Sequence, residues 1–391
     1  MRRSQRAKGD GSFLFLKDRQ MWRHRITING RRYESVKRTK AEARDANLNR
    51  AKGRIEGASG ELSASSQVRD IVEQFLMEKQ GEGKAKTHQT RVSHMNLYIL
   101  PHFGRIRLDK ISTNEIAKWL KDLGKSGGKD GRGLSPQSVK TALKQARAVG
   151  QWAEDRELWN RNLFTLIKPP QVVKTVRAMN RSEWSDLRES IAHEPLRALV
   201  HVAVGSGLRS GELIGLSWDD LDLERDDATL TVRKTITRIT GQGLIITSPK
   251  TKGSKRTLIL DPRLVREIVI HRDRQEQSRR KQVANGVEWG RKFPKYRWVF
   301  ANSEGNPLEA GKIRKEVERM CEFAGIEGFS VHELRHTCAS FAIASGVQLK
   351  ELSEMLGHAS IRETSDTYGH LYPASRVETS KRIADYQYSK K

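Results

Sequence analysis

Two interruptions divide this chain into three stretches with different residue patterns. Residues 57–66 are almost all small or polar, which is typical of a flexible linker. Pro169 and Pro170 then stand side by side, and neither can continue a helix or a central strand. A length of 391 residues suits two to four domains. We therefore predict three domains, which span residues 1–60, 61–170 and 171–391.

The first stretch is predicted to be a small sheet followed by a helix. Three short runs have the character of strands: residues 12–16, 22–28 and 31–35. Asn29 and Gly30, between the last two runs, are the strongest short signal for a tight hairpin. Thr39 and Glu42 form the pattern of a capping box, so a helix should begin there and run toward Arg54.

The second stretch has the pattern of a helical bundle. Residues 68–78 are amphipathic, with apolar side chains recurring on one face. Ser112 stands at the expected N-cap of a later helix, and Ser135 with Pro136 marks the start of another. The glycine-rich residues 124–133 contain no phosphate-binding loop pattern and follow no strand, so we interpret them as a connector.

The third stretch is mostly helical but contains strands. Asn180 and Glu183 form a capping box after the proline pair. Strand-like runs follow at residues 229–237, 243–247 and 256–260. The predicted fold class is therefore multidomain α+β, mainly α with small β parts. It comprises a three-stranded sheet with a helix, a helical domain, and a mostly helical domain with a small antiparallel sheet.

The charge of the chain predicts a polyanionic partner. Lys and Arg number 73 against 47 Asp and Glu, which gives a formal net charge of +26. The excess is spread along the chain, because residues 1–65 carry 17 basic and 7 acidic residues and so account for only 10 of these charges. A peptidase has no need of such a field, whereas a protein that binds nucleic acid does. We therefore predict nucleic-acid binding.

Several other classes of protein do not fit the composition. Cys321 and Cys338 are the only cysteines, too few for a disulfide framework or a cysteine-rich zinc finger. No apolar run is long enough to span a bilayer. The basic start at Met1 lacks the apolar region of a secretory signal. We expect a protein of a reducing cytoplasm with access to DNA.

The pentapeptide His-Glu-Leu-Arg-His at residues 332–336 has two incompatible interpretations. As H-E-x-x-H it is a zinc-peptidase helix, with Glu351 or Glu354 as the third ligand. As H-x-x-R it places His332 and Arg335 one helical turn apart, on one side, where they can bind phosphate. The fixed charge of Arg335 beside a zinc ion is unfavourable. We favour the phosphate interpretation and keep the zinc metallopeptidase, and a non-catalytic DNA-binding protein, as alternatives.

Other motifs could complete a phosphate site. Arg209 sits in a glycine-flanked turn, with Glu212 placed to orient its guanidinium. Residues 249–256 form a cationic tip between two strands, and a lysine there could act as a general acid. His358 follows a glycine, and Tyr368 lies ten residues further on. Each feature alone is ordinary, because such residues are usually surface pairs, solvated charges or packing groups.

The ordered set R-x-x-E, lysine hairpin, H-x-L-R-H-T, L-G-H and T-x-x-x-Y resembles the tyrosine recombinase (phage integrase) family. The resemblance implies the following catalytic residues: Arg209, Lys250, His332, Arg335, His358 and Tyr368. It gives Glu212 and His336 supporting roles behind them. Lys250 fits the family's K-T pattern best and Lys252 is the alternative. Glu333 stands where the family often has Asp.

The resemblance extends to the N-terminal half. Residues 1–60 resemble an AP2-like arm-binding domain, whose sheet enters a DNA groove, and residues 61–170 resemble a SAM-like core-binding domain. The candidate DNA contacts are Arg23, Arg25, Arg31, Arg32, Lys252, Lys255 and Arg256. The implied partners are double-stranded DNA with core-type and arm-type attachment sites, a homotetramer on that DNA, and an excision factor or host DNA-bending protein. The implied location is the bacterial host cytoplasm, in association with the nucleoid.

The chemistry of DNA strand exchange agrees with these roles. Two guanidiniums and imidazole donors can neutralise the charge that develops on the non-bridging oxygens of a phosphodiester, without a metal. A phenol ordinarily has a pKa of about 10. We expect the cationic pocket to lower the pKa of Tyr368, and His332 to accept its proton. A hairpin lysine would protonate the leaving 5′ oxygen. The 3′-phosphotyrosine bond conserves the energy of the cleaved bond, so neither ATP nor another cofactor is expected. The implied activity is integration of a phage or mobile element, with excision left open.

Overall fold

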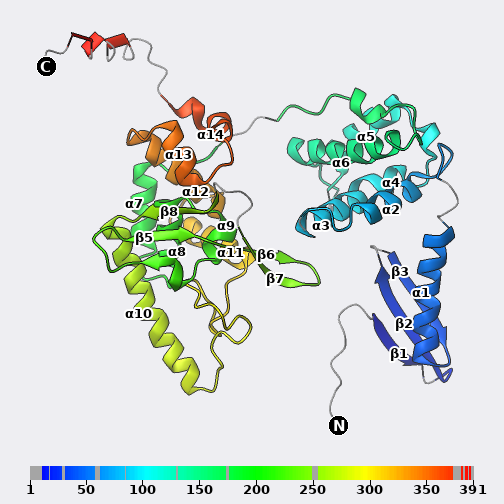
Figure 1. Ribbon diagram of the computed structural model, residues 1–391, viewed down its shortest axis with the longest axis horizontal. Coiled ribbons are helices and arrows are strands. Elements are labelled where there is room, and N and C mark those ends of the chain that lie inside the picture. Colours follow the sequence, from blue (N-terminus) through cyan, green and yellow to red (C-terminus); the bar gives the residue numbers. More distant parts are fainter. Residues whose placement is uncertain are drawn as a thin grey trace. The chain divides into compact units, whose positions relative to one another are not determined.

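The computed structural model describes residues 11–16, 18–28, 31–57, 62–83, 85–128, 131–172, 176–248 and 254–372, with six residues between 380 and 388. For residues 27, 28, 31 and 49–57 it describes the backbone alone. The described residues form two compact units that meet in sequence near residue 173. Figure 1 shows the course of the chain through each unit. The division of the chain into three domains stays a prediction.

The first unit begins with the expected three-stranded sheet and helix. Its elements are β1 (Ser12–Leu16), β2 (Met21–Ile28), β3 (Arg31–Lys37) and α1 (Lys40–Gly57). The strands pair antiparallel in the order β1-β2-β3, and α1 packs on β2 and β3 (Figure 1). The capping box is confirmed, since the amide of Glu42 donates to Thr39 Oγ1 at 3.2 Å. Asn29 and Gly30, the expected hairpin pair, lie outside the described residues.

The two faces of this sheet differ in burial. His24 and Ser35 are opposite one another on β2 and β3, and both are buried. Asn47 of α1 donates its side-chain amide to the carbonyl oxygen of His24 at 3.0 Å, which ties the helix to this face. Because side chains alternate along a strand, Arg23 and Arg25 lie on the other face. The sheet therefore has one face against α1 and one face with cationic side chains.

The rest of the first unit is a helical bundle, as predicted. Its helices are α2 (Val68–Glu78), α3 (Ala85–His94), α4 (Leu100–Phe103), α5 (Thr113–Ser126) and α6 (Pro136–Glu154), with a π-helical turn at Met95–Ile99. Ser112 and Ser135 accept hydrogen bonds from the third amide of α5 and α6, so both expected caps are confirmed. The core centres on Trp119, whose ring lies edge-to-face with those of Phe103 and Phe164.

The second unit packs helices around a small sheet. Its helices are α7 (Arg181–Ser190), α8 (Arg197–Ser206), α9 (Ser210–Ile214), α10 (Pro262–Ala284), α11 (Ala310–Phe323), α12 (Val331–Ala344), α13 (Leu349–Leu356) and α14 (Ile361–Tyr368). Helix α8 is the most buried of them and packs against α10 and α12. The capping box at Asn180 and Glu183 is present at the start of α7. This packing places the ends of α8, α9, α12 and α13 close together.

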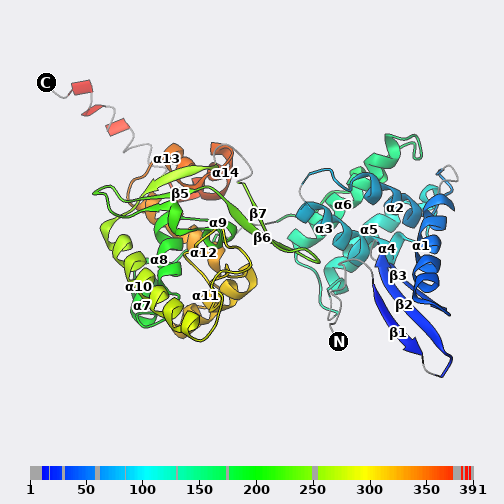
Figure 2. The same cartoon turned by 60° about the horizontal axis from the view of Figure 1, so that its bottom comes forward.

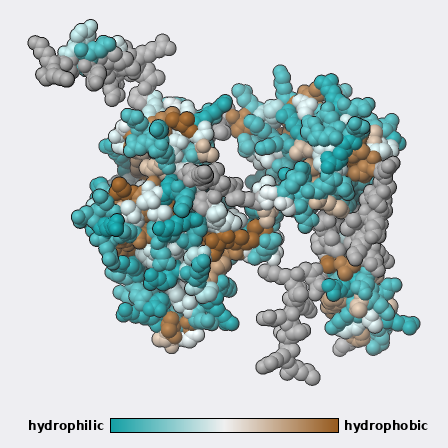
Figure 3. Space-filling view, viewed as in Figure 1, coloured by the Kyte–Doolittle hydropathy of each residue, from teal (hydrophilic) through white to brown (hydrophobic). Residues whose placement is uncertain are grey.

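The strands of the second unit form two separate sheets. The first is antiparallel, in the order β4 (Leu221–Asp222), β5 (Thr229–Val232) and β8 (Arg256–Ile259). The second is a ribbon of β6 (Thr235–Ile239) and β7 (Gly243–Thr247), which projects from the unit in both views (Figures 1 and 2). A hydrophobic patch lies over this ribbon, on a face that is otherwise largely hydrophilic (Figure 3).

The predicted strand at residues 229–237 is therefore two strands in different sheets. Two basic residues between them explain the break. Arg233 donates to the carbonyl oxygen of Asp219 at 2.7 Å, and Lys234 donates to Ser217 Oγ at 2.7 Å. The two acceptors, Asp219 and Ser217, both precede β4 in the chain. These contacts direct the backbone out of the first sheet after β5.

The composition gave expectations about the cysteines and about membrane-spanning helices. Cys321 and Cys338 are both buried and form no disulfide with one another. Among the helices of the described segments, none has the length and apolar character to span a membrane.

Candidate active site

Arg335 lies buried at the centre of the candidate site. It belongs to the second turn of α12, and 2% of its surface is exposed. Its guanidinium donates to the carbonyl oxygen of Gly207 at 2.5 Å and to that of Leu356 at 2.8 Å. Gly207 ends α8 in the left-handed region, with φ of +62°. Loss of water and the nearby Arg209 lower the pKa of Arg335 to about 10, so the group stays cationic at neutral pH.

Arg209, the N-cap residue of α9, approaches the same carbonyl groups. Its guanidinium donates to the carbonyl oxygen of Gly357 at 3.0 Å, and a longer contact of 3.4 Å reaches Leu356. Glu212 holds it at two points, because Oε1 accepts from the guanidinium and Oε2 accepts from the backbone amide, both at 3.0 Å. The side chain of Arg209 is 36% exposed, so part of its guanidinium can reach a ligand. The structure thus brings together the two arginines and gives Glu212 the expected orienting contact.

Arg256 differs from the sequence-based expectation of a DNA contact. It is the first residue of β8, and its side chain is 7% exposed. Its guanidinium donates to Glu212 Oε2 at 3.0 Å and to the carbonyl oxygen of Met355 at 2.6 Å. A buried carboxylate and a helix end attract the cation inward, and this overrides its place beside a basic loop. Lys255, the preceding residue, is exposed as expected.

His358 is fixed by the segment that follows it. Gly357 ends α13 with φ of +66°, and this turn directs the chain toward α14. His358 Nδ1 lies 2.7 Å from Thr364 Oγ1, and Nε2 lies 3.7 Å from a carboxylate oxygen of Glu363. Loss of water, followed by the charge of Arg335, lowers the pKa of His358 to about 4, so the ring is neutral at physiological pH. Thr364 was not predicted as a site residue, although it stands four residues before Tyr368 in the same motif.

Tyr368 is the last residue of α14 and is 1% exposed. Its hydroxyl oxygen lies 2.6 Å from Nδ1 of His336. Burial raises the pKa of Tyr368 to about 12, although Arg335 and Arg209 act in the opposite direction. The expected lowering of this pKa is therefore wrong for the structure described. Loss of water outweighs the two cations because the phenolate would be almost fully removed from solvent.

The histidine beside the tyrosine is also not the expected one. His332 is exposed, and its ring centroid lies 4.5 Å from that of His336. Loss of water, with smaller effects of Arg335 and Arg209, lowers the pKa of His332, while Glu333 opposes the change. His336 has its pKa lowered to about 4, first by loss of water and then by His332. The neutral imidazole in contact with the nucleophile candidate is thus that of His336, which was expected to lie behind the site.

The zinc interpretation of the pentapeptide does not fit these positions. Glu333, its would-be catalytic base, instead completes a capping box: its carboxylate accepts from the amide of Ser330 at 2.9 Å and from the Ser330 hydroxyl at 2.5 Å. Glu351 and Glu354, the proposed third ligands, are both exposed on α13. Within the described parts of the chain, no group of three His, Cys, Asp or Glu residues is arranged to hold a metal ion.

The remaining predicted DNA contacts fall in two places. Arg23 and Arg25 lie on the sheet face away from α1, where both approach Glu34, at 3.8 and 2.6 Å. Arg32 is exposed on the neighbouring strand β3. The side chain of Arg31, and both candidate catalytic lysines, Lys250 and Lys252, lie outside the described residues.

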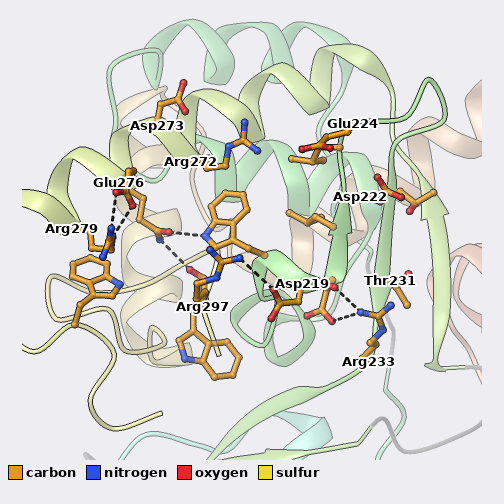
Figure 4. Close-up of a pocket in the computed structure, with 18 residues that line it drawn as sticks. Asp219, Asp222, Glu224, Thr231, Arg233, Arg272, Asp273, Glu276, Arg279 and Arg297 are labelled. Atoms are coloured by element: carbon orange, nitrogen blue, oxygen red, sulfur yellow. Dashed lines mark hydrogen bonds and ion pairs between the residues drawn. The ribbon is translucent and has the colours of Figure 1, made fainter. Parts of the chain in front are cut away.

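A concave region lies elsewhere on the same unit. It is an open cavity of about 1110 Å³ between the β4–β5 edge and α10 (Figure 4). Both acidic and basic side chains line its wall, including the pair Arg297 and Asp219 at 3.5 Å and the pair Arg279 and Glu276 at 2.8 Å. None of the residues that line it belongs to the arginine, histidine and tyrosine cluster.

Comparison with known proteins gives concordant matches for both units. A model of the phage integrase family matches residues 171–375, and a model of the phage integrase N-terminal SAM-like domain matches residues 67–124. A XerC-like tyrosine recombinase of Caldanaerobacter subterraneus subsp. tengcongensis is 31% identical over 270 residues, which cover 65% of this chain and 67% of the relative. The ICEBs1 integrase of Bacillus subtilis is 26% identical over 321 residues, which cover 81% and 82%.

Solved structures share the fold. The Tn1549 transposon integrase in complex with a circular intermediate DNA has a TM-score of 0.65 at 18% identity, covering 83% of this chain and 100% of the other. A lambda integrase dimer bound to a COC′ core site has a TM-score of 0.55 at 15% identity, covering 96% and 99%. The expected α+β class, with its N-terminal three-stranded sheet, is confirmed.

Proposed function

We propose how this chain acts from the premise that it belongs to the phage integrase family and is a tyrosine recombinase that cleaves and rejoins DNA at specific sites. In this proposal Tyr368 is the nucleophile, and Arg209 and Arg335 bind the scissile phosphate. His332 and His358 are proposed to donate hydrogen bonds to the same phosphate. The zinc peptidase and the non-catalytic protein are set aside.

One observation carries this proposal. Arg209, just before α9, and Arg335 of α12 come from distant parts of the chain, yet both guanidiniums reach the carbonyl oxygen of Leu356. Cations converge in this way only where their repulsion is offset, and here helix-end carbonyls and Glu212 offset it. Guanidinium donors that are not used by these contacts match the non-bridging oxygens of a phosphate. Preorganised donors of this kind stabilise the charge that develops in the transition state.

The proposed reaction is a transesterification at phosphorus, which runs forward in cleavage and backward in joining. The Tyr368 oxygen attacks phosphorus, a phosphotyrosine bond forms, and the bond to the 5′ oxygen breaks. The phenol proton passes to a neighbouring imidazole, and the 5′ oxygen takes a proton from a lysine of the hairpin, with Lys250 preferred over Lys252. Attack by a different 5′-hydroxyl reverses the sequence and joins a new strand, without ATP. Because Tyr368 is 1% exposed, the last turn of α14 must shift when DNA binds.

The remaining features of the proposal concern partners. The cationic sheet face with Arg23, Arg25 and Arg32 is proposed to bind arm-type DNA, and the helical bundle after residue 61 to bind core-type DNA. The integrases and transposon integrases among the relatives support integration of a phage or other mobile element, with excision as the reverse reaction. A homotetramer on DNA, assisted by an excision factor or a host DNA-bending protein, would pair two such sites in the host cytoplasm.

Covalent trapping tests the nucleophile directly. A duplex site, selected for binding from random DNA, is given a nick so that the short fragment that carries the new 5′-hydroxyl diffuses away after cleavage. We expect wild-type protein to form an adduct in EDTA and Tyr368→Phe to form none while still binding the duplex. Tyr372→Phe is the matched control, because the Tyr372 hydroxyl donates to the carbonyl oxygen of Val347 at 3.0 Å and lies four residues away. An adduct that survives in Tyr368→Phe and disappears in Tyr372→Phe would move the nucleophile to Tyr372.

A further inference from the structure

We propose that Arg256 is a positioning residue that sets the placement of Arg209 in the catalytic site, and that it does not contact DNA. The inference deepens the proposed function and rests on it, because both concern the same site. Arg256 follows the basic loop directly, where sequence alone favours a phosphate contact. Its side chain is 7% exposed, however, and its guanidinium is turned into the unit.

All three guanidinium nitrogens of Arg256 are used within the protein. Nε donates to the carbonyl oxygen of Met355 at 2.6 Å, Nη2 to Glu212 Oε2 at 3.0 Å, and Nη1 to the carbonyl oxygen of Ser254 at 3.2 Å. These acceptors belong to α13, to α9 and to the segment just before β8. One side chain therefore ties together three separate pieces of the site.

Glu212 transmits the position of Arg256 to Arg209. Its side chain is 5% exposed and lies between the two guanidiniums. Oε2 accepts from Arg256 and from the backbone amide of Arg209, both at 3.0 Å, and Oε1 accepts from the Arg209 guanidinium at 3.0 Å. Burial raises the pKa of Glu212, but Arg256 and Arg209 outweigh it and lower the pKa. The carboxylate is therefore ionised and bonded on both sides.

The end of α13 provides the second connection. Three consecutive carbonyl oxygens are held by three arginines: Met355 by Arg256, Leu356 by Arg335, and Gly357 by Arg209. These are among the carbonyls that a helix leaves without internal partners. The fit over Gly357 is close, since a Cβ atom there would lie 2.6 Å from Nη1 of Arg256. A displaced Arg256 would shift the carbonyl that Arg209 uses and the carboxylate that orients it.

Loss of Arg256 should affect Arg209 more than Arg335. Arg209 is partly exposed and must meet the phosphate in one geometry, whereas Arg335 has its own buried anchors at Gly207 and Leu356. Misplacing a catalytic group by about 1 Å costs on the order of 100-fold in rate. Loss of Arg256 should therefore resemble partial loss of Arg209 in its effect on one non-bridging oxygen.

The experiment measures single-turnover cleavage of two diastereomeric nicked duplexes, each with one non-bridging oxygen of the scissile phosphate replaced by sulfur. The ratio of the two rates does not depend on the fraction of folded enzyme. We expect Arg256→Met to lower the rate on ordinary duplex by roughly 100-fold and to shift the diastereomer ratio in the direction of Arg209→Lys. Arg256→Lys, which keeps the charge beside Glu212, should recover part of both effects.

Lys255→Met is the matched control, because it is the adjacent basic residue and is exposed. We expect Lys255→Met to weaken DNA binding and to lower the salt dependence of binding by about one phosphate contact. The ratio of the cleavage rates on the two diastereomers should be unchanged. Arg256→Met should leave that salt dependence as in wild type. A lowered salt slope with a wild-type ratio in Arg256→Met would make Arg256 a DNA contact and overturn the inference. A lowered rate with a wild-type ratio would also overturn it, since loss of folded protein explains that result. Absence of any wild-type adduct would refute the proposed function itself.

Discussion

Nδ1 of His336 lies 2.6 Å from the hydroxyl oxygen of Tyr368, and this contact fixes the buried phenol at the end of α14. His332, one turn earlier, is exposed, and its ring lies edge-to-face with that of His336. The two histidines of the pentapeptide therefore have separate positions, one toward the tyrosine and one toward solvent. Both rings have a lowered pKa, so both are neutral near pH 7.

Replacing His336 should slow covalent adduct formation without preventing DNA binding. His336→Ala removes the imidazole that contacts the phenol hydroxyl, and we expect a loss of rate on the order of 100-fold, the lower range for a proton-transfer group. His336→Asn retains an oxygen near the position of Nδ1 and should recover much of the rate. Single-turnover trapping on a nicked duplex measures both variants. Wild-type rates in His336→Ala would show that the contact is not used.

Acid should destabilise the second unit through its neutral histidines. His336 and His358 each have a pKa of about 4 in the folded protein, mainly through loss of water. An unfolded histidine titrates near about 6.5. Between these values the unfolded chain binds protons that the folded chain does not, so the free energy of unfolding falls as pH decreases from about 6.5 to 4. Above that window these groups contribute no further change.

Urea unfolding of the full chain at several pH values between about 5 and 7.5 measures this effect. His336→Asn should make the dependence shallower, because one of the two groups no longer titrates. His193→Asn serves as the control, because His193 is an exposed histidine of the same unit outside the site. A pH dependence that is equally steep in wild type and in His336→Asn would contradict the assignment.

Local sequence patterns predicted where helices begin better than they predicted whether a charged side chain is exposed or buried. The caps at Ser112, Ser135 and Asn180 depend on residues three positions apart, so the sequence alone contains the whole interaction. Arg256 was expected at the DNA surface, but it turns inward toward Glu212 and Met355, the latter 99 residues further along the chain. The inward position depends on tertiary packing that no local pattern encodes.

The same limit explains the errors at the tyrosine. The motif groups Tyr368 with two arginines, and the charges of Arg335 and Arg209 do act to lower its pKa. The net direction depends on how deeply α14 packs, which the motif does not specify. His332 and His336 lie four residues apart and so project from one side of α12. Spacing could not decide which of them meets the tyrosine.

A methyl group at Gly357 should disturb the site as well as the fold. Gly357→Ala places a side chain in the left-handed region, at a cost of about 1–2 kcal/mol, and directs it at Nη1 of Arg256, 2.6 Å away. Gly346→Ala is the matched control, because Gly346 also has positive φ, +90°, with nothing within 4 Å of the added atom. We expect both variants to unfold at lower temperature, and only Gly357→Ala to lose cleavage in excess of its loss of folded protein.

The cationic face of the N-terminal sheet yields a test of the proposed arm-DNA contact. Glu34 pairs with Arg25 at 2.6 Å and approaches Arg23 at 3.8 Å, so it competes with phosphate for both guanidiniums. Arg25→Gln should weaken binding to arm-type DNA and lower the slope of log affinity against log salt by roughly 0.9 for the lost phosphate contact. Glu34→Gln should strengthen the same binding, because both arginines are released.

Salt titrations of affinity on an arm-type duplex and on a core-type duplex distinguish this assignment from general charge. Arg280→Gln, on α10 with its side chain 77% exposed, removes the same charge from the second unit and should leave arm binding unchanged. Deletion of residues 1–60 should abolish arm binding and integration but spare cleavage of a nicked core duplex. If Arg25→Gln and Arg280→Gln reduce arm binding equally, the sheet has no specific part in it, and the overall charge of +26 explains the affinity.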